Sequence, residues 1–195
     1  MIRITTLFHT AALGLIMSAL TAQFANTQVV TTQAAKTSTI PISYLPFNIT
    51  APGTYVFTGN LTSTVTEGGG INTGAVNIST AIAGRVVVDL KGYTINGPGS
   101  LSRGITIGAI SWNLPSIYPI TIENGTITNV ELGIITPSQA NLSHMVIKDL
   151  AFNITSTGNA VGYGILINDV SSSLISNCTI NGVTYGIADS GSCWR

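Results

Sequence analysis

The chain has 195 residues, which is enough for one domain with a substantial hydrophobic core. Only 7% of its residues are charged, against roughly 25% in ordinary globular proteins, and seven basic side chains balance seven acidic ones. A neutral surface gives no counterion release on binding, which argues against nucleic acid as a partner and weakens the case for a strongly polyanionic substrate.

Residues 1–25 are predicted to be a signal peptide. Arg3 provides a minimal positive region, residues 7–20 are mostly apolar, and Ala22 and Ala25 are small residues suited to cleavage. A short membrane anchor is the alternative interpretation. No apolar run long enough to cross a bilayer follows this segment, so we expect no membrane span in the mature chain. The expected location is therefore secreted or at the cell surface.

Residues 26–39 are polar and featureless, which predicts a linker in front of a folded domain at residues 40–195. Residues 42–62 then alternate strand-forming residues with Pro-Gly and Gly-Asn turns. This part is expected to form an N-terminal cap and a first coil.

From Val86 onward the sequence repeats one pattern roughly every 22 to 31 residues. An apolar residue is followed by a turn residue two positions later and by a second apolar residue three positions after that. A Gly-Ile step then follows. A repeat of this length built from strand and turn residues is typical of a stacked β-solenoid, here with about three short strands per turn. The repeats are Leu90–Ile95, Ile122–Ile127, Ile147–Phe152 and Ile175–Ile180, with the steps at Gly104, Gly133, Gly164 and Gly186.

Stacking of the coils predicts columns of equivalent side chains, about 4.8 Å apart. Three columns should lie inside the solenoid, one should follow the turns, one should be an exposed column of alternating charge, and one should be an outward column of threonines. In that order the expected columns are Leu90, Ile122, Ile147 and Ile175; Ile95, Ile127, Phe152 and Ile180; Ile105, Ile134, Ile165 and Ile187; Gly92, Asn124, Asp149 and Asn177; Lys91, Glu123 and Lys148; and Thr94, Thr126 and Thr179, interrupted by Ala151.

Two segments carry a resemblance to a known family. VVVDLKGYTINGPG and ITIENGTITNVELGI, followed by repeats ending in Tyr-Gly-Ile, resemble the repeat of the pectate-lyase-like superfamily. The resemblance covers residues 40–195 and implies an all-β fold, a right-handed parallel β-helix of about five coils with an N-terminal cap. The family includes polysaccharide lyases, glycoside hydrolases, epimerases, tailspikes and adhesins, so the resemblance fixes no activity.

No catalytic segment of these enzymes is present, so no catalytic residue can be carried over, and no cofactor is expected. Asp149, Asp169 and Asp189 are 20 residues apart, but they do not share a position in the repeat and are interpreted as turn residues. His144 is the only histidine of the predicted mature chain, and an exposed or partly packed histidine is favoured over a general base.

Cys178 and Cys193 could pair in an exported chain, or remain two idle thiols, which is the favoured interpretation. No Cys-x-x-Cys motif or histidine cluster accompanies them, so no metal site is expected.

Aromatic residues give the strongest functional signal. Tyr163 and Tyr185 each precede a Gly-Ile step, so they should stack on adjacent coils and face outward, in one column with Arg103 and Leu132. Trp112 and Tyr118 lie in the longest connection. Flat aromatic faces bind neutral sugars by stacking, although tyrosine ladders also stabilise β-stacks without any ligand. The candidate carbohydrate contacts are Tyr163, Tyr185, Trp112, Tyr118 and Arg103.

Two functional hypotheses remain open. The first is an exported surface or structural protein that binds polysaccharide without catalysis. The second is a polysaccharide-processing enzyme whose site is cryptic or lies beyond this sequence. Residues 189–195 contain no recognisable solenoid cap, which predicts a truncated chain or an end covered by a second copy through end-to-end self-association.

Overall fold

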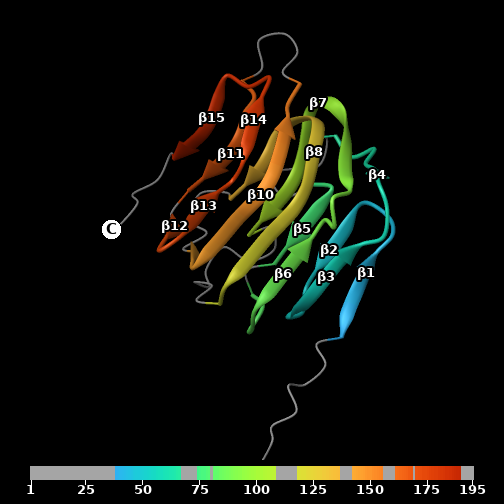
Figure 1. Ribbon diagram of the computed structural model, residues 1–195, viewed down its shortest axis with the longest axis vertical. Coiled ribbons are helices and arrows are strands. Elements are labelled where there is room, and N and C mark those ends of the chain that lie inside the picture. The colour runs from blue at the N-terminus through green and yellow to red at the C-terminus, as the bar shows by residue number, and fades with distance from the viewer. Residues whose placement is uncertain are drawn as a thin grey trace, which may run out of the picture. The chain divides into compact units, whose positions relative to one another are not determined.

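The computed structural model describes residues 38–66, 74–79, 81–108, 118–136, 142–155, 161–168 and 170–189 (Figure 1). These ranges contain strands and no helix. They accordingly contain no helix that is long and apolar enough to cross a membrane. The predicted signal peptide, most of the predicted linker, Trp112, Asp169 and Cys193 lie outside the described residues.

The strands form an all-β parallel solenoid, as the repeat predicts. Its first face is a continuous parallel ladder, in which the strands of consecutive turns lie side by side from β1 toward β13 (Figure 1). The members are β1 (Thr39–Ile42), β3 (Gly53–Phe57), β6 (Val86–Asp89), the start of β8 (Ile120–Ile135), the start of β10 (Met145–Asn153) and β13 (Leu174–Ser176).

The second and third faces are ladders of the same kind. The second contains β4 (Leu61–Thr62), the start of β7 (Thr94–Ile107), the middle of β8, the end of β10 and β14 (Thr179–Asn181). The third contains β2 (Phe47–Ile49), β5 (Val76–Ile78), the ends of β7 and β8, β11 (Tyr163–Ile167) and β15 (Tyr185–Asp189). Short strands β9 (Leu142–Ser143) and β12 (Val170–Ser171) pair with each other.

The solenoid has about 4 turns, where about five coils were expected. At each end of the stack, the last rung that the structure describes has a described neighbour on one side only. At one end, β1 pairs with β3 and β2 with β5; at the other, β13 and β14 pair with β10 and β15 pairs with β11.

Two of the three predicted internal columns are confirmed in full. In the second face, Ile127 pairs with Ile95 and Phe152, and Phe152 pairs in turn with Ile180. In the third face the column runs through Ile105, Ile134, Ile165 and Ile187. The inner members of both columns are completely buried, so the core is a set of stacked aliphatic and aromatic side chains along the solenoid.

The third internal column is shifted in one coil. Ile122, Ile147 and Ile175 stack as predicted, but the residue opposite Ile122 is Val88, so the prediction of Leu90 at this place was wrong. Thr94 still pairs with Thr126, which makes the bend of this coil two residues longer than the next one. Leu90 remains fully buried at the bend, where the missing side chain of Gly125 leaves room for it.

The predicted turn ladder is present. Asn124, Asp149 and Asn177 all have positive φ angles, of 60°, 55° and 50°, as expected of residues that tolerate the left-handed region. The Asn177 amide donates to the Asp149 carboxylate over 2.6 Å. In the longer bend, the Gly92 N–H donates to the Asn124 carbonyl at 2.7 Å, so Gly92 joins the ladder through its main chain.

The predicted charge column is confirmed at two positions and corrected at the third. Lys148 lies 2.9 Å from Glu123 on the neighbouring strand. The residue opposite Glu123 on the other side is Asp89, because of the longer bend, and Lys91 instead lies 3.2 Å from Asp89. Each of these pairs is partly exposed to solvent, so it contributes little to stability.

Candidate functional site

The predicted tyrosine pair forms. Tyr163 on β11 and Tyr185 on β15 are register partners, and their rings stack with centroids 5.3 Å apart and planes 16° from parallel. One face of each ring is therefore occupied by the other ring. Tyr185 is 52% exposed, so the accessible aromatic surface of the pair belongs mainly to this residue. The pair offers one platform at the last described rung, rather than a continuous series of flat faces.

The other two members of this column are in register but are not accessible. Leu132 pairs with both Arg103 and Tyr163, as the repeat predicted. Both Arg103 and Leu132 are only 8% exposed, however, so the expectation of an outward contact residue at Arg103 is corrected. The column can meet a ligand only at its tyrosine end.

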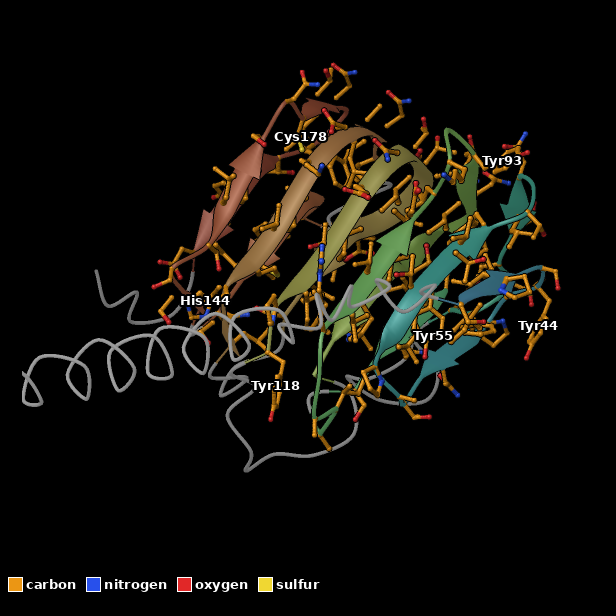
Figure 2. The ribbon with its side chains drawn as sticks, turned by 60° about the horizontal axis from the view of Figure 1, so that its bottom comes forward. Tyr44, Tyr55, Tyr93, Tyr118, His144 and Cys178 are labelled. Atoms are coloured by element: carbon orange, nitrogen blue, oxygen red, sulfur yellow. The ribbon has the colours of Figure 1, made fainter. Side chains whose placement is uncertain are left out.

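Of the remaining aromatic candidates the structure describes Tyr118, whose ring does not contact the tyrosine pair. Trp112 lies outside the described residues. Tyr118 is partly exposed just before β8, and Figure 2 shows it on the same side of the solenoid as His144, with Tyr93 and Cys178 on the opposite side. His144 is exposed, as one of its two expected environments required, and has a φ of 60°.

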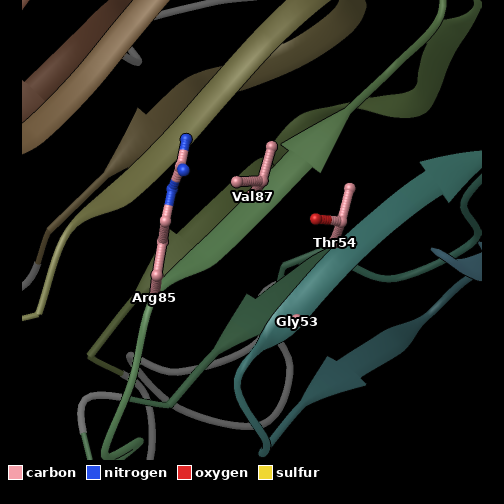
Figure 3. Close-up of a pocket in the computed structure, with 4 residues that line it drawn as sticks. All are labelled: Gly53, Thr54, Arg85 and Val87. Carbon is pink, nitrogen blue, oxygen red and sulfur yellow. The ribbon is translucent and has the colours of Figure 1, made fainter. Parts of the chain in front are cut away.

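A pocket of about 350 Å³ lies on the outer side of the first face, lined by Gly53, Thr54, Arg85 and Val87 (Figure 3). Arg85 is exposed and forms no ion pair with another described residue. The Arg85 guanidinium and the Thr54 hydroxyl could together hold a single anionic oxygen by hydrogen bonding. Among the described residues, neither a carboxylate nor a histidine lines the pocket.

Two carboxylates stand opposite each other on the first face, an arrangement that the sequence analysis missed. Asp89 on β6 and Glu123 on β8 are register partners on adjacent strands, which are about 4.8 Å apart. Glycosidases use two carboxyl groups in this way, one on each side of the bond that they break. Both are engaged here, because Asp89 contacts Lys91 and Glu123 contacts Lys148.

The surroundings of Asp89 favour its charged form. Burial alone would raise the pKa of Asp89, but three contacts outweigh it and hold the pKa below its ordinary value. The Lys91 N–H donates at 2.9 Å, the Asn124 amide donates at 3.2 Å, and the Lys91 ammonium lies nearby. The hydrogen-bonded Glu123 carboxylate in turn raises the pKa of the Lys148 ammonium. A general acid needs a raised carboxyl pKa, so Asp89 does not fit that role.

The lowered pKa of Asp89 predicts a loss of stability in acid. The unfolded chain takes up this proton first as the pH falls, so the contribution is complete above about pH 4 and is lost as the pH falls through the folded pKa. We expect Asp89→Asn to be less stable than the native protein by about 1 kcal/mol at pH 6. Urea unfolding at several pH values should show this difference shrinking below about pH 4; a difference that stays constant would contradict the assignment.

The remaining candidates have structural roles or are untested. Asp149 belongs to the turn ladder, and Asp189 ends β15 opposite Ile167. Cys178 is a partly buried free thiol that lies 3.3 Å from the Ser176 carbonyl, and burial raises its pKa. Within the described ranges, no group of three or more His, Cys, Asp or Glu residues is placed to hold a metal ion.

Comparison with known proteins gives no assignment: neither a protein-family model, nor a curated protein, nor a solved structure matches this chain.

Proposed function

We propose that this chain is an exported surface or extracellular protein that binds neutral polysaccharide at the Tyr163–Tyr185 pair and catalyses no reaction there. The observation that carries the proposal is the stacked pair itself, with its half-exposed outer ring. An aromatic face next to uncharged polar groups is suited to the apolar face of a sugar ring. The near absence of charge favours a neutral glycan over an acidic one.

The proposal also includes the fold family and the location. The repeat resembles that of the pectate-lyase-like superfamily, and three-face parallel stacking is consistent with it. Membership of that superfamily and the right-handed sense of the coil are part of the proposal. Export is supported by the apolar segment at residues 7–20 behind Arg3.

Replacing Tyr185 with alanine should weaken binding to a neutral polysaccharide. An aromatic stacking contact contributes about 0.5–1.5 kcal/mol beyond its buried area, so we expect a loss of affinity of about three- to tenfold. Affinity electrophoresis in gels containing soluble neutral plant and algal polysaccharides measures the retardation of each variant. Tyr185→Trp should preserve it.

The matched control is Tyr93→Ala. Tyr93 is also a partly exposed tyrosine, but it lies in the bend before β7, away from the tyrosine pair. If both variants bind as well as the native protein, or if both lose affinity equally, the tyrosine pair is not the binding site.

A polysaccharide-processing enzyme is the second candidate, and the Asp89–Glu123 pair is the observation that favours it. Glycoside hydrolases use paired carboxylates, but here each one is held by a lysine and the pKa of Asp89 is lowered rather than raised. Release of reducing ends or unsaturated products from the same polysaccharides tests it. Turnover by the native protein that Glu123→Gln abolishes would replace the non-catalytic proposal.

A further inference from the structure

The second face of the solenoid presents two outward columns, which we call the Thr–Asn face. Every rung reads Thr, Asn or Ala, then an apolar residue, then Thr or Asn. The inward residues Ile95, Ile127 and Phe152 are completely buried, so the residues on either side of each point away from the core. The two columns are Asn60, Thr94, Thr126, Ala151 and Thr179, and Thr62, Asn96, Thr128, Asn153 and Asn181.

The backbone holds this face in a regular two-dimensional net. Thr94–Asn96, Thr126–Thr128, Ala151–Asn153 and Thr179–Asn181 pair residue by residue, with no register shift inside the segments. Neighbouring rungs are about 4.8 Å apart, and alternate residues of a strand are about 6.6 Å apart. Threonine is β-branched and stiff at χ1, so its methyl and hydroxyl groups keep nearly fixed positions on such a backbone.

The face is uncharged, and its first column has unused hydroxyl groups. Neither column contains an acidic or basic residue. The hydroxyls of Thr94, Thr126 and Thr179 form no hydrogen bond to another described residue, and all three side chains are partly or fully exposed. By contrast, the first face carries the Asp89, Glu123 and Lys148 side chains. The ligand that fits the Thr–Asn face is therefore neutral, periodic in two dimensions and able to donate and accept hydrogen bonds.

We propose that the Thr–Asn face binds ice, with the ordered water of the crystal surface as its ligand. Water oxygens on faces of hexagonal ice repeat on a rectangular net with two spacings close to those of the columns. When the face meets the crystal, ordinary liquid water leaves the threonine methyl groups, which the hydrophobic effect favours. The hydroxyl groups between the methyls replace the hydrogen bonds that this water made to the ice surface. Each contact is weak, but all are formed at once because the net is rigid.

Crystalline polysaccharide is the competing ligand for such a face. Its pyranose rings are bound chiefly by stacking on aromatic side chains, and neither column contains one. The aromatic platform of this chain lies on the third face, at Tyr163 and Tyr185. The ice-binding proposal therefore does not rest on the proposed glycan site, and either one can fail without the other.

The test compares the native full chain with Thr126→Tyr and Val146→Tyr in assays of ice recrystallisation and thermal hysteresis. Production in bacteria leaves Asn60 and Asn153, which begin Asn-x-Thr triplets, without glycans. Thr126 lies in the middle of the Thr–Asn face, whereas Val146 is a similarly partly exposed outward residue of the first face. Strands accept tyrosine at such positions, and circular dichroism confirms that each variant is folded.

We expect the native protein and Val146→Tyr to inhibit recrystallisation at the same concentration. Thr126→Tyr should need about tenfold more protein, because one bulky ring separates the neighbouring groups from the crystal. The proposal is overturned if the native protein has no effect on ice, or if the folded Thr126→Tyr protein is as active as the native one. Retention on crystalline cellulose or chitin that Thr126→Tyr abolishes, without any effect on ice, would assign the face to polysaccharide instead.

Discussion

Replacing Gly133 with alanine is expected to lower the free energy of unfolding by about 3 kcal/mol. Gly133 belongs to the column of Gly-Ile steps, where the second face bends into the third. A Cβ atom here would lie 2.6 Å from Cδ1 of the buried Phe152 and would also clash with the main-chain carbonyl of Gly164. Neither neighbour can move freely, because one is core and the other is part of the next rung.

The matched control for this substitution is Gly186→Ala, at the same step of the last described rung. The nearest atom to an added Cβ is Cδ1 of Ile180 at 3.9 Å, an ordinary contact. Alanine also restricts the unfolded chain, so this variant should change stability by no more than about 1 kcal/mol in either direction. Urea denaturation of both proteins measures the contrast. Equal stabilities for the two variants would refute the close stacking of the steps.

The fold was largely predictable because it depends on side-chain types that recur at fixed places. Inward aliphatic residues, left-handed turn residues and the glycine steps each mark one position of a rung, and several columns agree on one register. Asn124, Asp149 and Asn177, for example, tolerate the positive φ angles that they adopt. Ile127 and Phe152 could be aligned because the turn residue fixes the distance to them.

The register error at Leu90 has a physical cause. Val86, Val88 and Leu90 alternate with a period of two, and a shift by two residues leaves the same side chains pointing inward. The sequence pattern therefore fits both Val88 and Leu90 opposite Ile122. The choice depends on the length of the bend, and bends vary between coils without changing the alternation. The same error hid the Asp89–Glu123 pair, because it placed Lys91 opposite Glu123.

The candidate site was predictable only in part. Strand alternation predicts the direction in which a side chain points, but not how much of it is exposed to solvent. The stacking of Tyr163 on Tyr185 follows from the repeat and is confirmed. The burial of Arg103 and Leu132 does not follow from it, because both occupy the same column as the tyrosines. The pocket beside Arg85 depends on the spacing of side chains across neighbouring strands, which no single repeat contains.

Two isoleucines of one column are expected to differ strongly in their contribution to stability. Ile134 lies between Ile105 and Ile165 and is 0% exposed, whereas Ile187 has a described partner only in Ile165 and is 54% exposed. Truncation of a buried isoleucine removes its contacts and leaves a cavity, so Ile134→Ala should cost about 3 kcal/mol. Ile187→Ala should cost no more than about 1 kcal/mol, since half of its side chain is already in water.

Chemical denaturation at low protein concentration is the appropriate measurement, because end-to-end self-association, which remains a prediction, would cover Ile187. Under these conditions the ratio of the two losses in unfolding free energy shows how the burial of the column changes along its length. A large loss for both variants would mean that the last rung is covered as well as the inner ones are. A small loss for both variants would mean that Ile134 is not part of the core. Such a result would contradict the stacked columns on which the fold and both proposed binding surfaces depend.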